Sequence, residues 1–301
     1  MQIFITGATG FIGQALTGRL LGQGHLLRVW ARAPAKAQAA LGAGVTVIDA
    51  GGGAAALERA IDGCDAVINL AGEPVIGTRW SDARKRALVD SRVGLTEAVV
   101  AAIAAAKVRP SVMVSASAVG FYGDRGEEAV DESAAPGSGF LAELCVAWEA
   151  AARAAEGLGV RVVRLRIGVV LGRGGGALAS LLPVARLGVA GPIASGRQYM
   201  PWIHVDDLVG MITAALTDPR YDGAVNGTAP TPASNRELMT TLGEVLRRPT
   251  IVPTPAFALR LALGEAATVL LEGQRAIPGR ALALGFEFSH PGLKGAIEAC
   301  V

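Results

Sequence analysis

The chain has 301 residues, of which 51% are hydrophobic and 18% charged, so a disordered protein is excluded and one large or two smaller domains with a buried core are expected. A net charge of +2 is too small to predict binding to nucleic acid or to an anionic membrane. No apolar run reaches the ~18–20 residues of a membrane span. No basic segment precedes the first apolar residues, so the expected location is the cytoplasm.

The N-terminal segment carries the most informative motif of the chain. A short apolar strand at residues 2–6 runs into a turn with Gly7, Gly10 and Gly13, and a helix is expected from about residue 11 to about residue 23. A glycine turn in this context lets the pyrophosphate of a dinucleotide rest on backbone N–H groups at the helix N-terminus. We therefore predict a nucleotide site; a glycine-rich turn without a ligand is the alternative.

Strand-like and helix-like segments alternate through the first two-thirds of the chain. Further strands are predicted at residues 26–31, 45–49, 66–70, 111–115 and 161–167, with helices at residues 35–40, 54–61, 81–106 and 141–156. This alternation predicts an α/β protein with a doubly wound parallel sheet, the Rossmann architecture, and helices on both faces.

The pattern is looser after residue 170. Residues 172–176, Gly-Arg-Gly-Gly-Gly, are expected to form a loop that is either a lid or merely tolerant of unusual backbone angles. A strand at 199–203, a helix at 205–216, a strand at 224–227 and a helix from Ser234 to about residue 246 follow. We expect residues 1–170 to form the dinucleotide-binding domain, with 199–227 returning to it, and residues 171–198 and 228–301 to form a smaller mixed substrate lobe.

The second predicted strand indicates which dinucleotide binds. In such folds an Asp or Glu about 20 residues past the glycine motif binds the ribose hydroxyls of NAD, but no acidic residue precedes Asp49. Arg32 ends the strand and Lys36 follows it, and a guanidinium suits a 2′-phosphate. NADP (NADPH) is therefore predicted and NAD is less favoured; ordinary surface cations are the alternative.

Other cofactor contacts are expected where the strands end. Asp49 is placed either to accept a hydrogen bond from the adenine amino group or to cap a turn. Small residues after the fourth strand let a cofactor lie against the backbone. Glu73 and Arg92 either face this pocket or form a surface ion pair. The expected contacts beyond the glycines, Arg32 and Asp49 are Thr9, Phe11, Ile12, Leu70, Ala71, Gly72 and Ser115.

No metal site is predicted. The three cysteines are far apart and form no CxxC pair, which indicates neither a disulfide framework nor a structural zinc site. The three histidines, His25, His204 and His290, are also distant in sequence and are not expected to cluster.

Four segments together resemble one protein family. They are the glycine motif, Asn69-Leu-Ala-Gly72, Ser115-Ala-Ser-Ala-Val-Gly-Phe-Tyr-Gly123 and Trp202-Ile-His-Val-Asp-Asp-Leu208. The whole chain resembles the extended short-chain dehydrogenase/reductase superfamily, and more narrowly its epimerase-like branch associated with cell-division inhibitors of the SulA type. The resemblance implies a Rossmann domain with a C-terminal substrate lobe. It also implies reduction, epimerisation or dehydration of a carbonyl or nucleotide-sugar substrate.

The chain departs from that family at the usual catalytic positions. The family's active site combines a Ser or Thr with a Tyr and a Lys four residues later, and the phenolate is the general acid/base. Aligned on Glu149, this chain has Leu141 at the tyrosine position and Cys145 at the lysine position. Ser117 is then the candidate to hold a substrate carbonyl, with Ser115 as the alternative. Tyr122 is either a substitute acid or a wall residue.

Two functions remain open from the sequence. The first is an NADP(H)-dependent oxidoreductase or epimerase-like enzyme acting on an unidentified small carbonyl or sugar-nucleotide-like substrate. The second is a non-catalytic NADP(H)-sensing regulatory or interaction module, which the missing Tyr and Lys favour. In either case we expect no nucleic-acid or membrane partner, and a monomer or a homodimer.

Overall fold

The computed structural model describes residues 1–301, and its centre is a seven-stranded parallel sheet in the order β12-β7-β5-β4-β1-β2-β3. The strands are β1 (Gln2–Thr6), β2 (Leu26–Ala31), β3 (Val45–Asp49), β4 (Ala66–Asn69), β5 (Val112–Ala118), β7 (Arg161–Ile167) and β12 (Gly223–Gly227). The register pairs Thr6 with both Trp30 and Asn69, so the turn after β1 lies between the ends of β2 and β4. All carboxyl ends therefore meet at one edge, where ligands bind in folds of this type.

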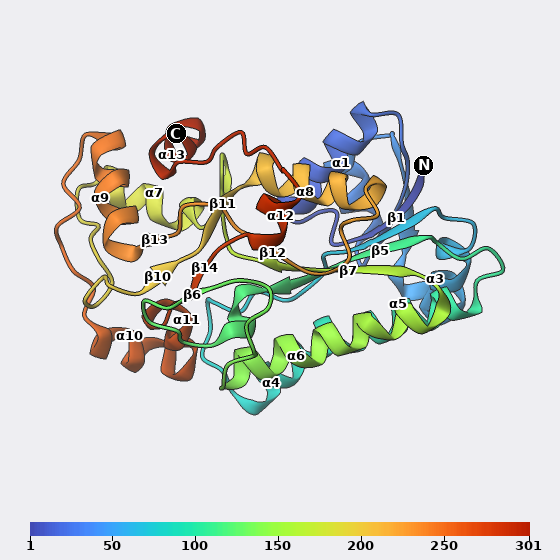
Figure 1. The fold of residues 1–301 in the computed structure, drawn as a ribbon, viewed down its shortest axis with the longest axis horizontal. Helices are drawn as coiled ribbons and strands as arrows, with labels where there is room; N and C mark the ends of the chain where they lie inside the picture. The colour runs from blue at the N-terminus through green and yellow to red at the C-terminus, as the bar shows by residue number, and fades with distance from the viewer.

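Helices cover both faces of this sheet (Figure 1), as the predicted fold class requires. On one face α1 (Phe11–Gly22) and α8 (Val205–Thr217) bury Leu16, Leu20, Leu208 and Ile212 against the sheet. On the other face α3 (Gly53–Ile61), α5 (Leu95–Ala105) and α6 (Phe140–Arg153) form a second apolar layer. The helix α2 (Pro34–Leu41) follows β2.

The helix predicted over residues 81–106 is not continuous. It consists of α4 (Asp82–Val89), a π-helical segment Asp90–Gly94, and α5. A π-helical turn accommodates an extra residue and is frequent at functional sites. It carries Arg92 to the edge of the sheet where the strands end.

The later part of the chain divides between the central sheet and smaller elements. Residues 199–203 are two short strands rather than one, and residues 172–176 close an antiparallel β8–β9 hairpin rather than an open loop. The smaller strands are β6 (Ala129–Val130), β8 (Val169–Gly172), β9 (Gly175–Gly176), β10 (Tyr199–Met200), β11 (Trp202–His204), β13 (Ala233–Ser234) and β14 (Arg275–Ala276). The remaining helices are α7 (Leu178–Arg186), α9 (Asn235–Leu246), α10 (Ala256–Leu263), α11 (Thr268–Leu271), α12 (Gly279–Ala283) and α13 (Leu293–Cys300). In Figure 1 α7, α9, α10 and α13 lie at the end of the molecule opposite β1.

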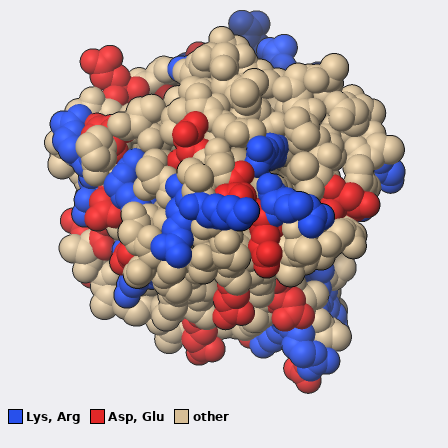
Figure 2. Space-filling view, turned by 90° about the vertical axis from the view of Figure 1, so that its right-hand side faces the viewer, with Lys and Arg blue, Asp and Glu red and all other residues tan.

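Charges on the face shown in Figure 2 are mixed in sign. Acidic and basic side chains are interspersed there, and no continuous basic surface forms on this face. This distribution agrees with the small net charge of +2. None of the helices combines the length and the apolar character that a membrane crossing needs.

Candidate functional site

The turn between β1 and α1 is built so tightly that side chains are excluded from it. Gly7 has φ +72°, and a Cβ on Gly7 would lie 2.7 Å from the Ala71 nitrogen. A Cβ on Gly13 would lie 2.2 Å from the Gly7 carbonyl oxygen. Both glycines are therefore required for the helix to start this close to the sheet.

The N-terminus of α1 is open to an anion. Gly10 is the N-cap, no side chain caps the helix, and its first turn contains no acidic residue. Uncapped N–H groups and the positive end of the helix dipole favour a phosphate at such a position. Thr9 is exposed beside the turn, and its carbonyl accepts a hydrogen bond from Gln14. Ile12 lines the adjoining cavity.

Phe11 connects the glycine turn to the β8–β9 hairpin. A Cβ on Gly172 would lie 2.6 Å from the nearest atom of the Phe11 ring, and a Cβ on Gly175 would lie 2.1 Å from it. The glycines of this hairpin therefore serve close packing on Phe11, a requirement that the run of glycines alone did not reveal.

At the end of β2, Arg32 is available to a ligand. Its guanidinium is 88% exposed, and its Nη1 lies 3.0 Å from Oε1 of Glu73, in the loop after β4. Arg84 approaches the other oxygen of Glu73 at 3.4 Å. Hydrogen bonding from Arg32 holds the pKa of Glu73 below its usual value. The ion pair thus spans the ends of β2 and β4, the two strands that flank the glycine turn.

Asp49 is exposed at the end of β3 and has a local hydrogen bond. Its Oδ1 accepts the Gly51 N–H at 2.8 Å and caps a short 3₁₀ turn. This is the capping alternative given above; an adenine contact through the second oxygen stays a prediction.

A chain of buried hydrogen bonds fixes the end of β4. The Thr6 hydroxyl donates to Oδ1 of Asn69 at 2.6 Å, and Nδ2 of Asn69 donates to the Thr96 hydroxyl at 2.8 Å. The Ala71 N–H donates back to Thr6 Oγ1 at 3.2 Å. Leu70 and Gly72 beside it line the cavity. Sequence reasoning placed Leu70, Ala71 and Gly72 here but missed the Thr6–Asn69–Thr96 support.

One large cavity, of about 680 Å³, opens at this edge of the sheet. It runs from Ile12, Leu70 and Gly72 beside the glycine turn to Trp80, Phe140 and Leu270 on the far side. Of its 34 lining residues, 20 are hydrophobic. An apolar cavity with a few polar groups is the usual form of a small-molecule site.

Ser117 is the cavity's buried hydroxyl. It is the last but one residue of β5 and is 2% exposed. Its hydroxyl donates a hydrogen bond to Oε1 of Glu149 on α6 at 2.8 Å. Ser115 is fully buried two residues earlier, and its hydroxyl reaches only the Ala116 carbonyl at 3.4 Å. Ser115 does not line the cavity. Of the two candidate serines, the structure therefore brings Ser117 to the cavity.

Tyr122 is absent from the cavity lining, where both roles suggested for it, a substitute acid or a wall residue, would place it. It is fully buried in a 3₁₀ turn after β5, and its hydroxyl donates to Asn226 at 2.7 Å and accepts from Arg166 at 2.9 Å. Burial raises the pKa of this phenol. The 3₁₀ turn after β5 directs the Tyr122 hydroxyl toward β7 and β12, where Arg166 and Glu149 link it to Ser117 without bringing it into the cavity lining.

A buried ion pair lies at the centre of the same network. Arg166 on β7 binds Glu149 through two bonds, of 2.7 and 3.0 Å, and both side chains are at most 4% exposed. The Arg166 guanidinium also stacks on Phe121 at 3.5 Å. Glu149 thus links Ser117 to Arg166, and the alignment that used Glu149 only as a reference point gave no sign of this role.

The two positions that depart from the family pattern both face the cavity. Leu141 and Cys145 line it one helical turn apart on α6. Burial, with a smaller contribution from Glu149, raises the pKa of the Cys145 thiol to about 11. Neither side chain supplies a proton relay at neutral pH.

Arg92 also lines the cavity, which resolves the two alternatives given for it. Its Nη2 donates to the Glu73 carbonyl at 2.7 Å, and its guanidinium lies 5.3 Å from the Trp148 ring. Burial lowers its pKa. It is the single Lys or Arg in the lining.

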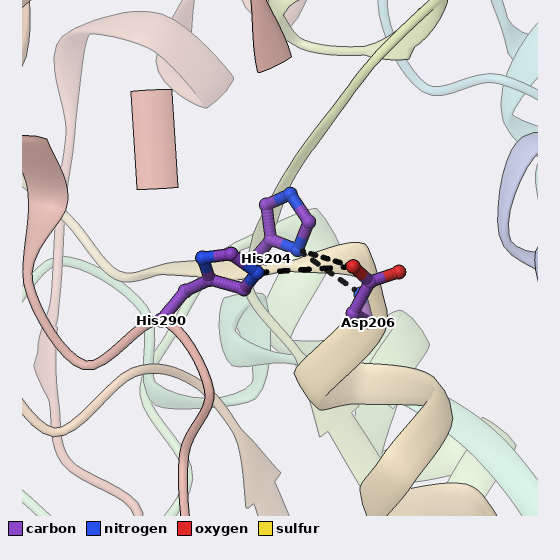
Figure 3. Close-up of side chains that lie close together, drawn as sticks. All are labelled: His204, Asp206 and His290. Carbon is purple, nitrogen blue, oxygen red and sulfur yellow. Dashed lines mark hydrogen bonds and ion pairs between the residues drawn. The ribbon is translucent and has the colours of Figure 1, made fainter. Parts of the chain in front are cut away.

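Two of the three histidines lie together, so the expectation that they do not cluster is wrong (Figure 3). The rings of His204 and His290 are 3.9 Å apart, and Oδ2 of Asp206 lies 3.5 Å from His204 and 3.8 Å from His290. Nδ1 of His204 accepts the Asp206 N–H at 3.2 Å and caps α8, so the lone pair of this ring nitrogen is in use within the helix cap. Burial, and then His290, lower the pKa of His204.

Comparison with known proteins agrees with this architecture. The NAD dependent epimerase/dehydratase family matches residues 3–226, and a domain of unknown function (DUF1731) matches residues 254–300. The chain is 45% identical over 305 residues to the epimerase family protein SDR39U1 homolog, chloroplastic, of Arabidopsis thaliana, covering 99% of this chain and 86% of that protein. It is 39% identical to human epimerase family protein SDR39U1 over the full length of both.

A solved structure gives the same result in three dimensions. The crystal structure of human epimerase family protein SDR39U1 (isoform2) with NADPH superimposes with a TM-score of 0.88 at 37% identity, covering 99% of this chain and 98% of that one. The family resemblance and the fold class predicted from the sequence are thereby confirmed. From its glycine turn to β12, this chain belongs to the NAD dependent epimerase/dehydratase family.

Proposed function

We propose that this protein is an NADP(H)-dependent oxidoreductase of the epimerase-like type that acts on a small carbonyl compound. The observation that carries the proposal is that the uncapped N-terminus of α1 and the cavity containing Ser117 meet at one edge of the sheet. The human relative crystallised with NADPH supports the choice of cofactor.

The residues present fit NADP(H) on structural grounds. The cradle formed by Gly7, Gly10 and Gly13 admits no Cβ at its first and last glycines and offers the N–H groups of Phe11 and Ile12 to the pyrophosphate. The exposed guanidinium of Arg32 is free to exchange Glu73 for a 2′-phosphate. The backbone after β4, at Leu70, Ala71 and Gly72, forms the wall toward the nicotinamide end.

Bound NADPH supplies a hydride to the carbonyl carbon of the substrate. In this proposal the Ser117 hydroxyl turns its hydrogen from Glu149 to the carbonyl oxygen, and the Arg92 cation in the same cavity favours the charge that develops there. Tyr122 and Cys145 are not assigned the proton, because the first lies outside the cavity and the second holds its own proton up to a pKa of about 11. Solvent water protonates the alkoxide, and the hydroxide that this leaves takes up a proton from the medium.

The test is NADPH oxidation with a panel of carbonyl compounds, comparing Ser117→Ala with Ser111→Ala. Ser111 immediately precedes the first residue of β5, at the end of the strand away from the cavity, and is exposed. Removal of its hydroxyl is therefore a matched control for removal of the Ser117 hydroxyl. We expect Ser117→Ala to lower kcat by about 100-fold with unchanged NADPH affinity, as for loss of one donor to a developing oxyanion. Ser111→Ala should behave as the wild type.

Two results would contradict the proposal. Equal rates for both variants would remove Ser117 from the chemistry. NADPH binding without oxidation by any carbonyl of the panel would leave the regulatory alternative, an NADP(H)-sensing module, as the better account.

A further inference from the structure

The far half of the cavity has the lining of an apolar ligand site. Trp80 and Phe140 pack edge to face with ring centroids 5.1 Å apart. Val269 and Leu270 on α11 and Met200 on β10 also line the cavity. These side chains come from elements far apart in the chain, so the apolar character belongs to the cavity and not to one segment.

The charges around this space oppose an anionic ligand. The lining contains three carboxylates and one cation, Arg92. Lys85 neutralises one of the carboxylates, Glu265, which leaves Asp124 and Glu272. Arg92 already donates to the Glu73 carbonyl and stacks on Trp148. A diphosphate requires Arg or Lys side chains or several free N–H groups, and like charges at close range disfavour binding.

Lys85 and Arg79 near this space interact with other groups of the protein, and Arg275 lies over the Tyr199 ring, 5.4 Å from its centroid. Lys85 lies 2.6 Å from Glu265 and over the Phe140 ring, and it is not in the lining. Arg79 donates to the Leu261 and Ala262 carbonyls. The amino end of α6 at Gly139 and Phe140 also favours an anion, but Glu143 in its first turn offsets the helix dipole.

We propose that this half of the cavity binds an uncharged carbonyl compound with an aromatic or branched apolar body, and excludes the nucleotide diphosphate of a sugar nucleotide. The inference rests on the proposed function, because it takes the other half of the cavity as the nicotinamide site. The family resemblance implies either a carbonyl compound or a nucleotide sugar as the substrate, and this inference keeps only the carbonyl compound. Trp80 and Phe140 provide the flat surfaces on which such a body stacks.

The test measures binding rather than turnover. The protein saturated with NADP⁺ is titrated in a calorimeter with 4-phenyl-2-butanone, with UDP-glucose and with inorganic pyrophosphate; the oxidised cofactor cannot reduce the ketone. We expect the ketone to bind and neither phosphate compound to do so. Binding of UDP-glucose with no binding of the ketone would overturn the inference, and pyrophosphate binding to this complex would place an anion site where we exclude one.

Variants locate the ketone. Phe140→Ala and Trp80→Ala should each weaken ketone binding by about tenfold, as expected for loss of one aromatic contact. Phe257→Ala is the matched control, because Phe257 is 73% exposed on α10 and outside the cavity. Unchanged ketone affinity in both cavity variants would overturn the inference. NADP⁺ affinity, measured alone, separates these outcomes from a failure of the proposed function, which would abolish cofactor binding itself.

Discussion

The buried pair of Glu149 and Arg166 allows a sharp test of how the site is held. Glu149→Gln removes the negative charge and leaves the Arg166 guanidinium, only 4% exposed, without a counter-charge. Breaking a buried pair from one side costs about 3–5 kcal/mol. At about 2.1 cal/mol/K of unfolding entropy per residue, this loss in a chain of 301 residues lowers the thermal midpoint by about 5–8 °C.

The assay is denaturant and thermal unfolding followed by circular dichroism. Glu143→Gln is the matched control, because Glu143 lies on the same helix and is exposed. Its free energy of unfolding should stay within about 0.5 kcal/mol of the wild type. If the two variants unfold at the same denaturant concentration, the buried pair does not hold the end of β5 against α6, and the reasoning about Ser117 positioning is refuted.

Three further predictions follow from single positions. Gly13→Ala should abolish NADPH binding in a fluorescence titration, because its Cβ would lie 2.2 Å from the Gly7 oxygen. Gly18→Ala on the same helix has open space around it and should bind NADPH normally. Binding of NADPH by both variants would contradict the role of the glycine turn as the pyrophosphate site. Burial lowers the pKa of His204 in the folded protein below the 6.5 of the unfolded chain. As the pH falls, the unfolded chain therefore binds a proton at this histidine before the folded protein does. The stability that neutral His204 contributes is lost as the pH falls from 6.5 through the folded pKa. His204→Asn, which keeps a cap, should therefore lose less stability between about pH 7 and about pH 5 than the wild type, and an equal loss would refute this assignment. Cys145, with its pKa raised to about 11, should resist iodoacetamide at neutral pH, as followed by mass spectrometry; rapid modification of the folded protein would contradict its burial.

Much of the central sheet was predictable because its strands are short apolar runs separated by helices. The predicted bounds of β1, β2, β3 and β7 agree with the structure. The break in the helix predicted over residues 81–106 could not be predicted, because the extra residue of a π-helical turn leaves no recognisable pattern in an alanine-rich sequence. The β8–β9 hairpin was also missed, since its glycines serve packing on Phe11 rather than flexibility.

The parts of the candidate site that lie at strand ends and turns could be predicted from the sequence. The parts that depend on contacts between side chains far apart in the chain could not. The glycine turn, Arg32 and the strand ends lie at one edge because parallel strands place them there. Neither role considered for Tyr122 predicted its burial against Arg166 and Asn226, because those partners come from β7 and β12, far along the chain. The pairings of Glu149 with Arg166 and of His204 with His290 join distant segments and carry no local signal.

The most direct test of the account is a calorimetric titration of the wild type, Arg32→Ser and Arg19→Ser with NADPH and NADH. Charge-assisted hydrogen bonds of about 1.5–3 kcal/mol predict that the wild type binds NADPH about 10–100-fold more tightly than NADH, and that Arg32→Ser abolishes this difference. Arg19→Ser, exposed on α1, should retain it. Binding of neither coenzyme, or NADH affinity equal to that for NADPH in the wild type, would contradict the account.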